Sequence, residues 1–166
     1  ALGGLFGAAF FGVLIFWISI IGYVGWVLLA GLQAAFVAGF GAAWARLSRF
    51  RHAWTRLIPA AAAWVAFEYL RARVPVGGFT WGQLAQSQTE ALALDVAPFT
   101  GGWGSAFLVV AANALVAEAW TAWRERAGLL LTIGWGGAAA ACVLWPALLP
   151  AGYVSGRALE VAIIQG

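Results

Sequence analysis

The residues best suited to chemistry gather in one stretch of the sequence, residues 64–88. Glu68 and Arg71 lie three positions apart within it, so on a helix their opposite charges fall on one face. A carboxylate near the end of an apolar helix is costly unless it is paired or hydrated. We therefore predict that the two side chains pair, either as a purely structural ion pair or as a group that holds the following loop or orients a lipid headgroup.

The segment at 73–100 is predicted to be a loop that packs at the membrane surface. Pro75 and Pro98, with three glycines between them, exclude a continuous helix. Irregular backbone at membrane depth is tolerated only where it is buried in protein or lines a cavity. The loop also contains Phe79 and Trp81, so we do not expect it to be a solvated linker. The residues predicted to orient this loop are Glu68, Arg71, Gly78 and Gly82.

The composition indicates a membrane protein. Of the 166 residues, 64% are hydrophobic and 9% are charged, whereas a soluble domain carries about 25% charged residues. One core cannot bury so large an apolar excess, so the solvent for most of the chain is predicted to be lipid. We expect an all-α membrane fold, a polytopic bundle of about five transmembrane helices within a domain at 1–156. The expected spans are residues 2–21, 24–45, 57–70, 101–122 and 127–149.

Some residues within the spans predict contacts between helices. Small residues recur along the first span and let another helix approach closely, namely Gly3, Gly7, Ala8 and Gly12. Gln33 is the one polar interruption of the second span and should face protein rather than lipid. The only cysteine, Cys142, lies within an apolar run and is predicted to be a packing residue.

Charge sets the expected orientation in the membrane. The net charge is +3, and arginines cluster at Arg46–Arg56 and at 124–126, which two spans separate and so place on one face. Positively charged loops favour the cytoplasm, so the loop at 73–100 and the C-terminus are expected on the outer face. The clusters offer no stacked basic surface for a nucleic acid, and His52 has no metal-ligand spacing around it. We predict no metal and no cofactor.

The last residues change character. Apolar residues alternate with others along 159–164, which is the periodicity of a strand. We expect residues 157–166 to begin a water-soluble domain on the outer face that has been cut away. The chain also starts at Ala1 without an initiator methionine, so we expect it to be a fragment or a processed product.

Several motifs, taken in order, resemble the membrane domain of bacterial apolipoprotein N-acyltransferases. They are EYLR at 68–71, GFTWG at 78–82 and SQ at 87–88, with GLFG at 4–7, FFG at 10–12 and Trp17 upstream, and GGWGSAFLVVAAN at 101–113 and VAIIQG at 161–166 downstream. The last motif looks like the first strand of that family's nitrilase-like domain. The resemblance covers nearly all of the chain.

The resemblance implies an enzyme of the bacterial inner membrane. Its outer nitrilase-like domain would use a Glu–Lys–Cys triad to take an acyl chain from membrane phospholipid and pass it to the α-amino group of diacylglyceryl-modified lipoproteins. A covalent thioester divides one hard acyl transfer into two easier steps. This chain contains no lysine, and its only cysteine lies in a span, so no catalytic residue is expected in it. Its implied role is to anchor the catalytic domain and to present lipid. Under this resemblance we predict a lipid entrance formed by Trp81, Phe79, Gln83, Ser87 and Gln88.

Two other functions stay open from the sequence. A transporter or channel module would need polar groups that converge at mid-bilayer, or an inverted repeat. Near the middle of the spans the sequence offers Gln33 and Asn113, and it shows no repeat. The chain could also be the membrane anchor of another amidase-like enzyme on the outer face.

Overall fold

The computed structural model describes residues 2–89 and 91–150, and all regular structure within these residues is helical. The elements are α1 (Leu2–Leu14), η1 (Phe16–Ile20), α2 (Tyr23–Leu47), α3 (Trp54–Arg71), η2 (Leu84–Ser87), η3 (Leu92–Leu94), α4 (Ala97–Arg124), α5 (Leu129–Leu144) and η4 (Trp145–Leu148). The predicted all-helical bundle is thus confirmed for this part of the chain. The predicted strand, and with it the domain start at 157–166, lies outside the described residues.

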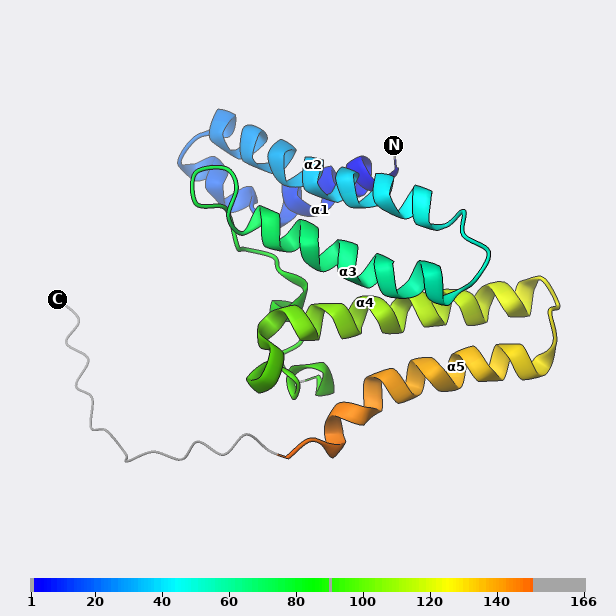
Figure 1. Ribbon diagram of the computed structural model, residues 1–166. Coiled ribbons are helices and arrows are strands. Elements are labelled where there is room, and N and C mark those ends of the chain that lie inside the picture. The colour runs from blue at the N-terminus through cyan, green and yellow to red at the C-terminus, as the bar shows by residue number, and fades with distance from the viewer. Residues whose placement is uncertain (1, 90, 151–166) are drawn as a thin grey trace, which may run out of the picture.

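The helices pack in chain order. Figure 1 shows α2, α3, α4 and α5 side by side, with α1 packed against α2. The α2–α3 and α4–α5 connections lie at one end of this layer, and the segment between α3 and α4 lies at the other. Both arginine clusters therefore lie at one end of the bundle. This agrees with the sequence prediction, in which two spans separate the clusters and so place them on one face. Which side of a membrane that end faces stays a prediction.

The outer surface of the bundle is strongly apolar. Leu2, Ile20, Leu130 and Leu148 are each more than 80% exposed. Burying such surface is worth about 25 cal/mol per Å², so this exterior is suited to lipid rather than water. Three helical segments are long and apolar enough to cross a membrane, namely α2, α4 and Leu129–Leu148. They agree with three of the five predicted spans, and a crossing by α1 or α3 stays a prediction.

The boundaries of three predicted spans differ from the structure. The first is not one helix, because α1 ends at Leu14 and a 3-10 turn follows the fully buried Ile15. A helix end leaves carbonyls unpaired, and the Trp26 indole donates to one of them, Gly12 O, at 3.0 Å. The third span starts earlier than predicted, at Trp54. The fourth starts at Ala97 and contains a kink at Gly101, where φ is 65°.

Close approach of α1 to α2 depends on a small residue. A Cβ added to Gly7 would lie 2.9 Å from both Ala34 Cα and Val37 Cβ, closer than van der Waals contact allows. The predicted helix contact is therefore confirmed at Gly7, and a Cβ at Gly3 would likewise meet Val37 O at 3.0 Å. The prediction is wrong at Gly12, because no atom lies within 4 Å of a Cβ added there. Gly12 instead offers its carbonyl to Trp26.

An ion pair joins α3 to α4 at the arginine-rich end. Nη2 of Arg56 lies 2.6 Å from Glu118 Oε1, and both side chains are largely shielded from solvent. The sequence places these residues 62 positions apart, so no local spacing rule could pair them.

We expect this pair to contribute about 1 kcal/mol or less, because its side chains, 22% and 17% exposed, still reach solvent, and ion pairs in contact with solvent are only weakly stabilising. Arg56→Gln, Glu118→Gln and the double variant form a cycle that isolates the coupling. The measurement is the free energy of unfolding in detergent micelles. Glu125→Gln, in the neighbouring charged turn, is the control. Strict additivity of the two substitutions would show that the pair adds nothing.

Candidate functional site

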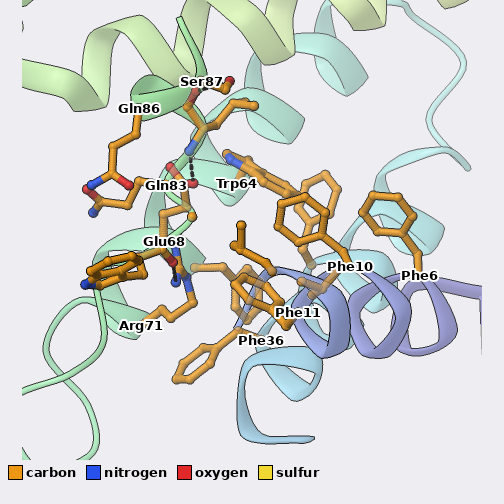
Figure 2. Close-up of a pocket in the computed structure, with 17 residues that line it drawn as sticks. Phe6, Phe10, Phe11, Phe36, Trp64, Glu68, Arg71, Gln83, Gln86 and Ser87 are labelled. Carbon is orange, nitrogen blue, oxygen red and sulfur yellow. Dashed lines mark hydrogen bonds between the residues drawn. The ribbon is translucent and has the colours of Figure 1, made fainter. Parts of the chain in front are cut away.

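A cavity of about 520 Å³ lies between α1, α2, α3 and the loop that follows α3. Its apolar wall is mainly aromatic, and it includes Phe6, Phe10 and Phe11 of α1, Phe36 and Phe40 of α2, and Trp64 of α3. Polar side chains gather on the opposite side, where Glu68 and Arg71 meet Gln83, Gln86 and Ser87 of the loop (Figure 2). The cavity is thus amphipathic, with its polar groups at the loop.

Glu68 fixes the part of the loop that forms η2. The residue is only 5% exposed. Its Oε1 accepts a hydrogen bond of 2.7 Å from the backbone N–H of Leu84, the first residue of η2. A hydrogen bond between a backbone N–H and a carboxylate is about twice as strong as one between neutral groups. The carboxylate therefore ties the loop to the last turns of α3.

Arg71 holds the loop at a second point. Its buried guanidinium donates through Nη1 to the carbonyl oxygens of Phe79 at 3.0 Å and Trp81 at 2.8 Å, and to Gln33 Oε1 of α2 at 3.3 Å. The backbone N–H of Phe79 also donates to the carbonyl of Arg71 at 2.8 Å. The guanidinium carbon lies 5.1 Å from the centroid of the Phe11 ring. Arg71 thereby connects α1, α2, α3 and the loop.

The predicted ion pair between Glu68 and Arg71 is wrong. Among the residues that the structure describes, the pair within salt-bridge distance is Arg56 with Glu118. The carboxylate accepts a hydrogen bond from a backbone N–H of the loop, and the guanidinium donates to backbone carbonyls of the loop. Each charged group therefore faces the end of a peptide dipole that is opposite to its own charge. The two residues act in parallel on the loop, and Gln33 faces protein as predicted.

Two buried polar atoms at the cavity have no hydrogen-bond partner among the described residues. They are Oε2 of Glu68 and Nε1 of Trp64. The indole N–H lies beside the carboxylate, although the contact falls outside strict hydrogen-bond geometry, so these two groups face each other. Buried polar groups are nearly always hydrogen-bonded, so each such exception calls for a physical explanation.

The loop reverses over the end of α3 at a glycine. Gly78 has a φ of 79°, and a Cβ there would collide with the backbone of Ala72 and Arg73. The chain can therefore return to Arg71 only if this position lacks a side chain. Gly82, with a φ of 74°, lines the cavity itself, and a Cβ there would meet the side chain of Leu14.

Comparison with known families decides the relationship. The family model described as the apolipoprotein N-acyltransferase N-terminal domain matches residues 1–115. This chain belongs to that family. The matched residues include all of those that line the cavity. No solved structure matches the chain.

Within this N-acyltransferase domain, the structure brings most of the predicted site residues together. Trp81, Gln83 and Ser87 line the cavity with Glu68, Arg71 and Gly82. Phe79 is not part of the lining and contributes its carbonyl to Arg71 instead. Gln88 is also outside the lining, and its side-chain amide donates to Ser87 Oγ at 2.8 Å. Gly78 shapes the turn before the cavity.

The sequence prediction missed the aromatic wall. Phe6 and Phe10 in α1, and Phe36 and Phe40 in α2, each lie four positions apart and so share a helix face. Trp64 has the same spacing to Glu68. This repeated spacing is the signal that could have identified the faces. It was obscured because aromatic residues are frequent throughout the chain.

Proposed function

We propose that this chain is the membrane domain of an apolipoprotein N-acyltransferase, which anchors the catalytic nitrilase-like domain in the bacterial inner membrane and presents phospholipid to it. Family membership supports the assignment to an acyltransferase. The observation that carries the role is the amphipathic aromatic cavity, covered by a loop that two buried charged residues hold in place. In the proposed orientation, the loop and the C-terminus face outward and the arginine clusters face the cytoplasm.

In the proposed reaction, a catalytic cysteine thiolate of the nitrilase-like domain attacks an acyl ester of a phospholipid and expels the lysophospholipid. The α-amino group of a lipoprotein's diacylglyceryl-cysteine then attacks the thioester, which forms an amide and releases the thiol. We assign no catalytic step to the present chain. Its Cys142 packs between α5 and α4, with Sγ 3.8 Å from Leu108 O. Its proposed task is to receive an acyl chain and orient it.

Trp81 has the position expected of a residue at a lipid entrance. It is 56% exposed, it lines the cavity, and its ring centroid lies 5.3 Å from that of Trp17. Trp17 itself is partly exposed. The two indoles thus form an aromatic contact between the end of the first apolar segment and the loop, at the rim of the cavity.

We expect Trp81→Ala in the full-length enzyme to lower the rate of acyl transfer about tenfold, equivalent to about 1.4 kcal/mol in the barrier. The reason is that the loop would lose its apolar surface for an acyl chain while the Arg71 bond to the Trp81 carbonyl remains. The measurement is acyl transfer to a diacylglyceryl-modified lipoprotein. Trp54→Ala is the matched control, because Trp54 is 59% exposed and pairs with Trp135 at 5.6 Å away from the cavity. Unchanged transfer at normal protein levels would contradict the proposal.

The geometry does not favour a transporter or channel module. Such a site needs polar groups that converge near the middle of the membrane. Gln33 is buried and engaged by Arg71, whereas Asn113 is exposed and donates to Val109 O of its own helix at 2.8 Å. The two midspan amides serve separate contacts. A role as the anchor of a different amidase-like enzyme has no specific observation in its favour.

A further inference from the structure

A separate hollow of about 600 Å³ lies at the turn between α4 and α5, at the end of the bundle away from the loop that follows α3 (Figure 1). Its lining includes Arg124 and Arg126, together with Trp123 and Leu129. Among the residues that the structure describes, neither arginine lies within salt-bridge distance of a carboxylate. Glu125 stands between them in the sequence but is exposed and does not line the hollow. The α4–α5 hollow therefore presents two positive charges that no described carboxylate pairs with.

Arg126 occupies a backbone position that normally favours glycine. Its φ is 53°, and its N–H donates to Trp123 O at 3.2 Å while the N–H of Ala127 donates to Ala122 O at 2.9 Å. This is the Schellman arrangement that ends a helix, in which the left-handed residue is usually glycine. A side chain at this position costs backbone strain. An arginine held there despite the strain suggests a function for its side chain.

The surroundings of the hollow are those of a membrane surface. Trp120 and Trp123 are 58% and 59% exposed, and their ring centroids lie 4.9 Å apart. Exposed indole rings favour the level at which lipid headgroups meet acyl chains. Leu129, the first residue of α5, is 75% exposed. A molecule in the hollow would therefore meet charged groups and an apolar surface together.

This combination selects the class of ligand. A guanidinium binds phosphate oxygens through two parallel N–H donors. In a zwitterionic headgroup a cation offsets the phosphate, whereas an anionic headgroup keeps a net negative charge and gains more from nearby arginines. A soluble phosphate would use the arginines but not the apolar surface beside them. The hollow thus fits an anionic lipid better than a zwitterionic lipid or a free phosphate.

We propose that the α4–α5 hollow binds an anionic membrane lipid, with Arg124 and Arg126 holding its phosphate and Trp123 and Leu129 lying against its glycerol and upper acyl groups. The site is distinct from the aromatic cavity, and the lipid is bound there without being acylated or cleaved. The inference rests on the proposed function only in placing this end of the chain at a membrane surface.

The test offers the chain an equimolar mixture of phosphatidylglycerol and phosphatidylcholine with identical acyl chains. Native mass spectrometry of the chain, released from detergent, measures how much of each lipid stays bound. We expect phosphatidylglycerol to be retained about tenfold more, because both arginines favour a net negative headgroup. Equal retention of the two lipids would overturn the proposal.

A matched pair of double variants separates a site from diffuse attraction. Arg124→Gln with Arg126→Gln should reduce the preference to about twofold or less. Arg49→Gln with Arg51→Gln removes the same charge at the same spacing from the exposed α2–α3 connection, which lies at the same end of the bundle. This control should keep a preference of about fivefold or more. Equal losses in the two double variants would overturn the site, because the preference would then follow total charge.

Arg126→Gly tests the side chain while favouring the fold. Glycine suits a φ of 53°, so this variant should be at least as stable in detergent as the unaltered chain. Its preference for phosphatidylglycerol should nevertheless fall about threefold. A full preference in this variant, or a loss of stability, would contradict the role assigned to Arg126.

Glycerol phosphate distinguishes a lipid from a soluble phosphate as the ligand. Added in tenfold excess over the lipid, it should displace little of the bound phosphatidylglycerol, because it lacks the acyl groups that meet Trp123 and Leu129. Complete displacement would overturn the assignment to a lipid. These measurements involve no transfer step and no residue of the aromatic cavity, so their outcome is independent of the Trp81→Ala transfer assay.

Discussion

Arg71→Ala is expected to destabilise the chain by about 3–5 kcal/mol, the range seen when one partner is removed from a buried charged network. Arg71 is 3% exposed, and its guanidinium donates to the carbonyls of Phe79 and Trp81 and to Gln33 Oε1. Without it, these acceptors lose their donor, and Glu68 loses the nearby positive charge that offsets its own. The backbone hydrogen bond from Phe79 N–H to residue 71 remains, so the loop is loosened rather than detached.

Two measurements separate this effect from general damage. Unfolding in detergent gives the free-energy loss, and hydrogen exchange reports the loop through the amide of Leu84, which is bonded to Glu68. Arg73→Ala is the matched control, because this neighbouring arginine is exposed and stacks on the Tyr69 ring at 3.6 Å. Its loss should cost about 0.5–1 kcal/mol. If Arg71→Ala were no more harmful than Arg73→Ala, the anchoring role assigned to Arg71 would be wrong.

The sequence predicts the helices well where their ends carry polar or helix-breaking residues. The second predicted span, 24–45, agrees with α2 because glycine precedes it and arginine closes it. The predicted C-terminal end of the first span was wrong because residues 2–21 are apolar almost throughout. Such a run contains no signal for where the helical hydrogen bonds stop. The break at Ile15 depends on burial and on the Trp26 contact to Gly12, which come from tertiary structure.

The partners of the site residues also depend on tertiary structure and could not be predicted from local spacing. Spacing brought Glu68 and Arg71 to attention, and both do orient the loop. Spacing also paired them with each other, because an i, i+3 rule considers one helix only. Their actual partners are 38 residues away at Gln33 and 8 to 16 residues away in the loop. The two side chains do not pair with each other because each forms hydrogen bonds to backbone groups of the loop. No sequence pattern indicates where a loop will fold back onto a helix.

The second large expected effect is a loss of stability at Gly78, in the turn that returns the loop to the end of α3. Gly78→Ala should cost more than about 3 kcal/mol, since a positive φ and a backbone collision act together. The added Cβ would strike the Ala72 and Arg73 backbone at the end of α3. The turn could avoid this only by moving away from the helix, and Phe79 would then leave its bonds to Arg71.

Gly77→Ala provides the matched control for that effect, because its φ of 89° is equally unfavourable to alanine but no atom lies within 4 Å of the added Cβ. It should cost only the conformational penalty of about 1–2 kcal/mol. The difference between the two variants, measured as free energies of unfolding in detergent, isolates the close approach. Equal costs would mean that the turn does not need to contact α3.

Combining Gly78→Ala with Arg71→Ala shows whether both changes release the same loop. Their joint cost should then be well below the sum of the single costs, whereas strict additivity would show that the turn and the guanidinium stabilise different parts of the molecule.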